Sequence, residues 1–212
     1  MNLWLSCYLL FVGLVLGSSA PTPEECKPLV TPRSLDDPSV MYGRLNFLVG
    51  YTGHEVYKEM LKLTDSSWVN TTTSPSGSGE IVMSQENRMN GTCLASEANM
   101  TIEGNTARVE VTNAVSSFHL LPSCDGCLVF MINSTTRNIK HLLKLMRLNL
   151  DVGDVIDSRS VYLLSKESAL KESELEHFKQ QASCLGFSGD PDFIYNPEKS
   201  FCAKGEGIKI SM

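Results

Sequence analysis

The sequence predicts an all-β fold, an antiparallel sandwich or barrel that is followed by one C-terminal helix. Three observations predict it. Apolar and polar residues alternate in short runs between Tyr42 and Leu121, turn residues separate these runs, and a helical period begins only near the end of the chain. A period of two is typical of strands with one buried face. Strands that follow one another at this spacing indicate antiparallel pairing rather than a βαβ fold.

Four runs alternate most clearly, at 45–51, 81–85, 108–112 and 116–121. Segments rich in Gly, Asn, Asp and Ser interrupt the pattern at 74–79, 90–91, 103–105 and 125–126. These residues form turns because they tolerate left-handed backbone or bond to it. After about eight strands, Leu175, Phe178 and Leu185 recur at helical intervals, so we expect a helix over about 168–186. Ser173 and Glu176 suit a capping box, and Gly186 suits a C-cap.

The N-terminus predicts export. Residues 1–20 contain no charged side chain and end in the small residues Gly17, Ser18, Ser19 and Ala20. This pattern is typical of a cleaved signal peptide, with a retained N-terminal anchor as the alternative. Residues 21–40 hold five prolines, which predicts an extended arm rather than a helix. Residues 41–212 would form the barrel domain with its helix and tail.

Composition and motifs argue against nucleic-acid binding and against a catalytic or cofactor-dependent function. The chain has 212 residues and a net charge of −6, with 18 Lys and Arg against 24 Asp and Glu. A nucleic-acid partner is excluded because no basic excess exists to neutralise phosphates. We find no metal spacing among His54, His119, His141 and His177, and no nucleotide or hydrolase motif. The sequence therefore predicts neither a catalytic centre nor a cofactor.

Cysteines and glycosylation sequons both favour an extracellular protein. Without Cys7, six cysteines remain, an even number that predicts disulfides. Asn-X-Ser/Thr sequons, the predicted glycosylation sites, occur at Asn70, Asn90, Asn99 and Asn133. Cys124 and Cys127 flank Asp125-Gly126, a favoured type I′ hairpin turn. A hairpin disulfide is the main interpretation of this pair, and free or metal-binding thiols or a redox Cys-X-X-Cys centre are the alternatives.

Several segments resemble the lipocalin family. Gly43-Arg44-Leu45 resembles the Gly-X-Trp of the first lipocalin strand, with Leu45 in place of the tryptophan. Ser160-Val161-Tyr162, Cys184-Leu185, Ile194-Tyr195 and Cys202 resemble the C-terminal third of the α1-acid glycoprotein (orosomucoid) branch. Fish saxitoxin-, tetrodotoxin- and tributyltin-binding proteins and apolipoprotein M belong to the same neighbourhood. The resemblance implies an eight-stranded up-and-down β-barrel with the C-terminal helix packed outside.

The resemblance also implies disulfides and a ligand. It pairs Cys26 with Cys184 and Cys93 with Cys202. Alternation along the strands, together with the resemblance, directs ten residues toward a ligand in the barrel. These are Phe47, Tyr51, Met83, Gln85, Arg108, Phe118, Leu128, Phe130, Ser160 and Tyr162. The alternative is that the aromatic residues simply fill the core, and a register slip of one residue would turn Arg108 outward.

The segment Arg137–Leu150 belongs to a long insertion at 134–158. Ile139, Leu142, Leu143, Met146 and Leu150 form one apolar face, with Lys140, Lys144 and Arg147 around the other. Packing on the barrel is the main interpretation, and contact with a lipid or lipoprotein surface or a lid over the ligand are the alternatives.

Together these observations predict a secreted plasma or body-fluid glycoprotein that transports small hydrophobic or amphipathic molecules, including toxins or xenobiotics. The alternatives are a lipoprotein- or membrane-associated lipid carrier and a thiol-dependent enzyme that uses Cys124 or Cys127.

Overall fold

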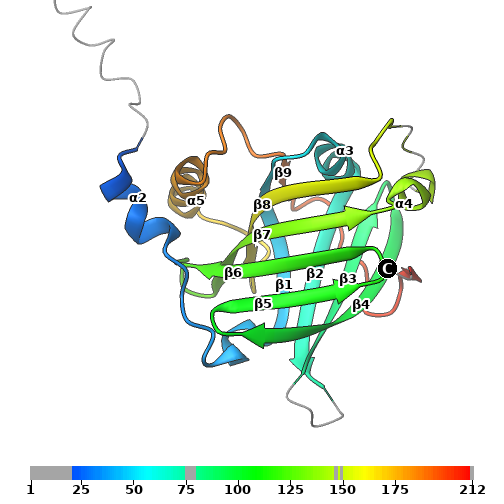
Figure 1. Cartoon of the computed structure of the whole chain (residues 1–212), viewed down its shortest axis with the longest axis horizontal. Helices are drawn as coiled ribbons and strands as arrows, with labels where there is room; N and C mark the ends of the chain where they lie inside the picture. Colours follow the sequence, from blue (N-terminus) through cyan, green and yellow to red (C-terminus); the bar gives the residue numbers. More distant parts are fainter. Residues whose placement is uncertain (1–20, 75–79, 146–147, 149, 211–212) are drawn as a thin grey trace, which may run out of the picture.

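The structure, a computed structural model, describes residues 21–74, 80–145, 148 and 150–210. The predicted signal peptide at 1–20 lies outside the described residues. Eight strands form a closed antiparallel barrel (Figure 1). They are β1 (Gly43–Thr52), β2 (Thr64–Thr73), β3 (Ile81–Met89), β4 (Thr92–Glu103), β5 (Thr106–Val111), β6 (Ala114–Leu121), β7 (Cys127–Arg137) and β8 (Val155–Ser165).

The barrel closes through two pairings. Each strand pairs with its neighbours in the sequence, β4 pairs with β5 through Met100 and Val109, and β1 pairs with β8 through Tyr51 and Val161. The predicted eight-stranded up-and-down barrel is therefore confirmed. Two short strands add to its rim, β9 (Phe193–Ile194) beside β1 and β10 (Ile208–Lys209) parallel to β4.

An irregularity in β1 decides which of its side chains enter the barrel. The register against β8 shifts between Phe47 and Val49, as in a β-bulge. Before the shift, the odd-numbered residues Leu45 and Phe47 point inward, and after it the even-numbered position Gly50 does. A Cβ on Gly50 would lie 2.5 Å from the Phe47 ring and 2.9 Å from the Tyr162 ring. Glycine is required here because both rings lie against the backbone.

The C-terminal helix α5 (Glu172–Cys184) packs on the outside of the barrel, as predicted. Phe178 and Ala182 are buried against the outer side of β1. The predicted capping box was wrong by two residues, since the backbone N–H of Lys171 donates to the Glu174 carboxylate at 3.0 Å. Gly186 does end the helix, with a φ of +86°.

The prediction of an extended arm at 21–40 was wrong, because helix α2 (Pro23–Val30) lies within it. Thr22 caps this helix and Glu25 bonds back to the Thr22 N–H at 2.8 Å, which makes a capping box. Pro23 occupies the first helical position, where its missing N–H costs nothing. Of the five prolines, Pro23 thus begins this helix and Pro28 lies inside it.

Three disulfides join the six described cysteines: Cys26–Cys184, Cys93–Cys202 and Cys124–Cys127. The first two pairs are those that the resemblance implied. Cys26–Cys184 links α2 to the end of α5. Cys124–Cys127 spans the turn before β7, but only Gly126 has a positive φ, so the predicted type I′ geometry, which needs a positive φ at Asp125 as well, is wrong.

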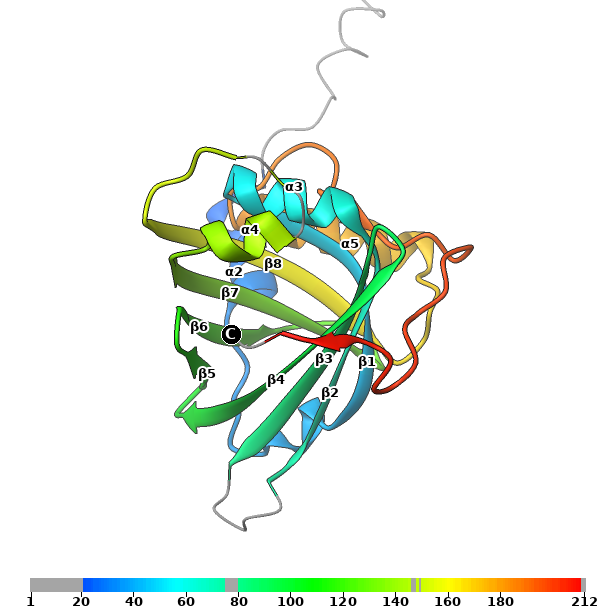
Figure 2. The same ribbon diagram turned by 90° about the vertical axis from the view of Figure 1, so that its right-hand side faces the viewer.

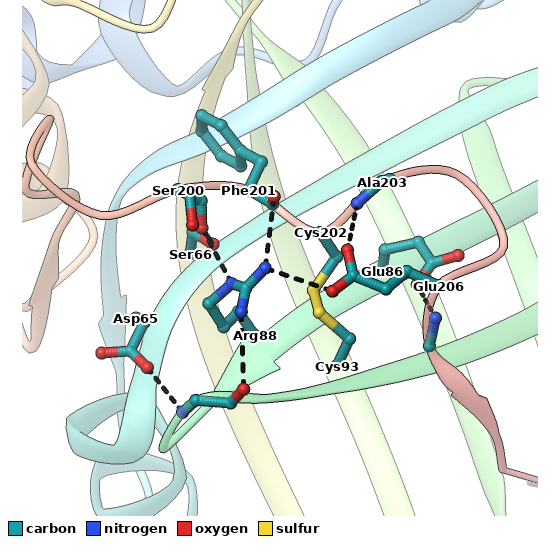
Figure 3. The surroundings of a disulfide bond; sticks show 12 residues. Asp65, Ser66, Glu86, Arg88, Cys93, Ser200, Phe201, Cys202, Ala203 and Glu206 are labelled. Carbon is teal, nitrogen blue, oxygen red and sulfur yellow. Dashed lines mark hydrogen bonds and ion pairs between the residues drawn. A yellow bond between two sulfur atoms is a disulfide. The ribbon is translucent and has the colours of Figure 1, made fainter.

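Cys93–Cys202 fastens the C-terminal tail to the outside of β4, and polar contacts surround it (Figure 3). The Arg88 guanidinium donates to the Ser200 carbonyl at 3.0 Å and pairs with the Glu206 carboxylate at 3.5 Å. The buried Glu86 carboxylate accepts the N–H groups of Gly205 and Gly207 at 2.7 and 3.0 Å. These contacts hold the tail that leads to β10.

Trp68 and Arg44 secure the tail from the side of β2 and β1. The Trp68 indole N–H donates to the Cys202 carbonyl at 2.8 Å, and the Arg44 guanidinium lies 4.6 Å from the Trp68 ring centroid. Trp68 is buried on the outer face of the barrel, so it does not replace the tryptophan that is absent at Leu45.

Each end of the barrel is covered by short elements. The 3₁₀ helix η1 (Pro38–Met41) closes one end, where Met41 is buried and its carbonyl accepts the Thr71 hydroxyl. Helix α3 (Glu55–Leu63) and helix α4 (Lys140–Leu145) lie side by side at the other end (Figure 2). Among the described residues, no helix is both long and apolar enough to cross a bilayer.

Candidate functional site

The interior of the barrel contains two adjoining chambers, each of about 230 Å³. The first chamber lies between η1 and β6–β8, and the second lies beneath α3 and beside β2–β4. They share five lining residues: Tyr57, Val69, Gln85, Tyr162 and Leu164. A barrel of eight strands has room for one small ligand when its interior is not filled by side chains.

Eight of the ten predicted ligand residues line this interior. The first chamber is bounded by Met83, Gln85, Phe118, Leu128, Phe130, Ser160 and Tyr162. Phe47 lines the second chamber, where its ring stands 4.6 Å from the ring centroid of Tyr162. Phe118 and Phe130 meet edge to face at 6.1 Å. The aromatic residues therefore form walls around open space rather than a solid core.

The inward positions predicted for Tyr51 and Arg108 were wrong. Tyr51 follows the irregularity in β1, points outward, and donates from its hydroxyl to the Gly189 carbonyl at 3.1 Å. Arg108 lies on the outer face and pairs with Glu110 at 3.3 Å, since its neighbours Ala107 and Val109 take the buried positions of β5. The only cation predicted for the site is thus outside the barrel.

Several lining residues come from elements that strand alternation could not reveal. Met41 enters from η1 and Tyr57 from α3, and both helices were missed. Leu45, which replaces the lipocalin tryptophan, lines the first chamber beside Met41. Ser134 and Ser158 were also missed, although Ser134 is two residues beyond Ile132 and Ser158 two residues before Ser160, which are the spacings of inward positions.

A row of hydroxyl groups crosses the first chamber near the end covered by α3. Ser116, Ser134 and Ser158 are direct partners across β6, β7 and β8, and all three line the chamber. The Ser116 and Ser134 hydroxyl oxygens lie 2.7 Å apart. Ser158 lies 3.3 Å from the Thr52 hydroxyl, which accepts from Ser160 at 2.9 Å. We call Ser116, Ser134 and Ser158 the serine row.

Helices α3 and α4 lie over the end of the barrel next to the serine row (Figure 2). Val56 packs with Ile139, Leu143, Val152 and Ile156 in one buried cluster, and the half-buried Leu150 packs against it. This cluster is the packed arrangement predicted for part of 137–150. Met146, Arg147 and the Leu142 side chain lie outside the described residues.

Tyr57 connects this cover to the barrel wall. It extends from α3, and its hydroxyl lies 2.6 Å from the Thr136 hydroxyl on β7. Its side chain lines both chambers, so the residue that links α3 to β7 also bounds the chambers at their α3 end.

No charged side chain lines either chamber within the described part of the chain. Burial raises the pKa of Tyr162 to about 12, so its phenol stays neutral at physiological pH. The single cluster of possible metal ligands among the described residues is Cys93, Cys202 and Glu206, and both sulfur atoms already form a disulfide. The described interior is apolar with neutral hydrogen-bonding groups.

The raised pKa values of Tyr51 and Tyr162 lead us to expect that the free energy of unfolding depends on pH. Burial raises the pKa of both Tyr51 and Tyr162 from 10 to about 12, and the carboxylates of Asp190 and Asp192 add to the effect at Tyr51. Because the folded pKa is the higher one, this contribution is complete below pH 10 and is lost as the pH rises toward about 12. We expect the free energy of unfolding to fall over that range in denaturant titrations, and to fall less in Tyr51→Phe and Tyr162→Phe. Unchanged pH profiles in both variants would contradict this assignment.

Comparisons with known proteins show the fold. No protein-family model matches the chain, and no curated protein matches it. The siderocalin Ex-FABP, described as functioning through dual ligand specificities, matches with a TM-score of 0.53 at 10% identity, over 74% of this chain and 94% of that one. A second siderocalin, described as having a dual ligand binding mode, matches with a TM-score of 0.50 at 12% identity, over 73% and 87%. The chain has the lipocalin fold.

Proposed function

We propose that this chain is a secreted carrier that binds a small hydrophobic or amphipathic molecule inside its barrel. The observation that carries the proposal is the interior of two adjoining chambers, each of about 230 Å³, walled by Phe47, Phe118 and Phe130. Enclosed, mostly apolar cavities with a few polar groups are the usual form of small-molecule sites. The siderocalins that share the fold are described as ligand-binding proteins, which adds support.

Three features support secretion and glycosylation. All six described cysteines are in disulfides, which persist in oxidising compartments. Asn90, Asn99 and Asn133 are exposed, and Asn70 is half-buried next to the outward Trp68 in the strand alternation, so each sequon lies on the outer side. The first twenty residues have the pattern of a signal peptide. The α1-acid glycoprotein-like motifs, with both long-range disulfides, further suggest a body-fluid carrier of drug-like or toxin molecules.

The structure gives less support to a lipid-surface carrier. The described apolar side chains of 137–150 pack inward, because Ile139 and Leu143 are buried against Val56 of α3. They would have to leave this cluster before they could enter a membrane.

Binding of a neutral fluorophore tests the proposal. N-phenyl-1-naphthylamine brightens in apolar surroundings. We expect the secreted, purified protein to bind it with a dissociation constant of about 0.2 mM or lower, since roughly 0.3 kcal/mol for each of its about 17 heavy atoms gives about 5 kcal/mol. Tyr162→Ala should weaken this affinity while the circular dichroism spectrum is retained. Absence of any saturable fluorescence change in the wild-type protein would contradict the carrier function.

A further inference from the structure

The charged side chains of β8 lie on the outer face of the barrel, and the serines that alternate with them along the strand point into the first chamber. Asp157 and Arg159 are outward, and Ser158 and Ser160 between and after them line the first chamber. Arg108 and Asn133 occupy the same outer groove as Asp157 and Arg159. This arrangement follows from the period of two along a strand, which places adjacent residues on opposite faces.

A charged ligand group would be poorly accommodated inside. A carboxylate or ammonium group that enters the first chamber loses its hydration, and no described lining residue offers an opposite charge. Burial of an unpaired ion costs several kcal/mol, whereas a neutral hydroxyl or carbonyl group needs only one or two hydrogen bonds.

The serine row can supply those hydrogen bonds. Ser116 and Ser134 share one bond between them, and a pair of hydroxyl groups has a further O–H donor and further lone pairs. Toward η1, the chamber is apolar, with Met41, Met100, Leu128 and Phe130 on its walls. The chamber is therefore polar near α3 and apolar near η1.

We propose, on the basis of the carrier function above, that the first chamber selects uncharged molecules with one hydroxyl or carbonyl end, and that this end lies on the serine row. Neutral long-chain alcohols, esters and similar amphipathic molecules fit this description. Free carboxylates and alkylammonium ions of the same length are rejected.

Competition among matched probes tests the selection. N-phenyl-1-naphthylamine is bound first and then displaced at about pH 7 by decan-1-ol, methyl decanoate, decanoate or decylammonium. We expect the alcohol and the ester to displace the fluorophore at concentrations at least about tenfold lower than either ion, because only the ions lose uncompensated charge solvation. If decanoate or decylammonium competes as well as decan-1-ol, the neutral selection is overturned and the carrier function stands. If the fluorophore itself does not bind, the carrier function fails as well.

A pair of variants tests the position of the polar end. In Ser116→Ala combined with Ser134→Ala, we expect the affinity for decan-1-ol to fall by about three- to tenfold relative to the affinity for the fluorophore, the value of one or two lost hydrogen bonds. Ser117→Ala is the matched control, because Ser117 is adjacent on β6 and faces the outer groove. An unchanged alcohol affinity in the double variant, or an equal loss in the control, would overturn the assignment to the serine row.

Discussion

Removal of the Cys26–Cys184 disulfide by Cys26→Ala and Cys184→Ala is expected to lower the free energy of unfolding by about 5 kcal/mol. The reason is chain entropy: the bond joins residues 158 positions apart, so its loss lets the unfolded chain explore many more conformations. Denaturant titration of the oxidised variant and wild type measures the difference. Poor secretion of the variant would agree with so large a loss.

The disulfide between Cys124 and Cys127 is the matched control, because its residues are only 3 positions apart. The same model gives about 2 kcal/mol for its removal by Cys124→Ala and Cys127→Ala. Equal losses for the two pairs would contradict the entropic account and would point instead to native contacts. One such contact is available at the first pair, since the buried Gln181 amide of α5 donates to the Leu29 carbonyl of α2 at 2.6 Å.

The strands were predictable because their signal is local. Phe118 lies in a regular alternating run and reaches the interior as the period of two requires. Phe130 and Tyr162 also reach the interior, but they lie in continuous apolar runs, where the resemblance to the lipocalin family helped to assign the inward face. The register of β6, β7 and β8 shows no irregularity, so one inward residue fixes the rest. The C-terminal helix was predictable for the same reason, from the helical spacing of Leu175, Phe178 and Leu185.

The failures arise where a single residue changes the local geometry. Alternation assigns Tyr51 to the same face as Phe47, but the register shift between them reverses the face. No feature of the composition near Leu48 marks this shift except Gly50, whose missing side chain admits the two rings. For α2, the Thr22 and Glu25 capping pair was a readable signal that the count of prolines obscured.

The cover of the barrel could not be predicted, because it depends on contacts between distant segments. Val56 and Leu143 lie in separate helices of nine and six residues, each too short to be stable before packing. The bond between Tyr57 and Thr136 joins positions 79 residues apart. Only the closed barrel brings these segments together, so strand patterns alone cannot predict that Tyr57 lines the two chambers.

Filling the first chamber with a side chain is expected to abolish binding while the barrel remains folded. In Ser116→Trp, an indole replaces a hydroxyl that faces the cavity of about 230 Å³, so it occupies the space that a ligand would take. We expect the affinity for N-phenyl-1-naphthylamine to fall by at least about a hundredfold, which corresponds to about 2.8 kcal/mol. The cost in stability should be no more than about 1–3 kcal/mol, the usual range for overpacking, because the chamber is open space.

Ser117→Trp provides the comparison, since it adds the same indole one residue away on the outer face of β6. This variant should bind the fluorophore like the wild type, because its new ring lies in the outer groove with Arg108 and Arg159. Fluorescence titration of the two variants measures whether the indole blocks the first chamber, and their thermal unfolding measures whether it destabilises the barrel. If both variants retain full affinity, the fluorophore binds outside the first chamber. If both lose it, the loss reflects a disturbed barrel wall rather than an occupied cavity.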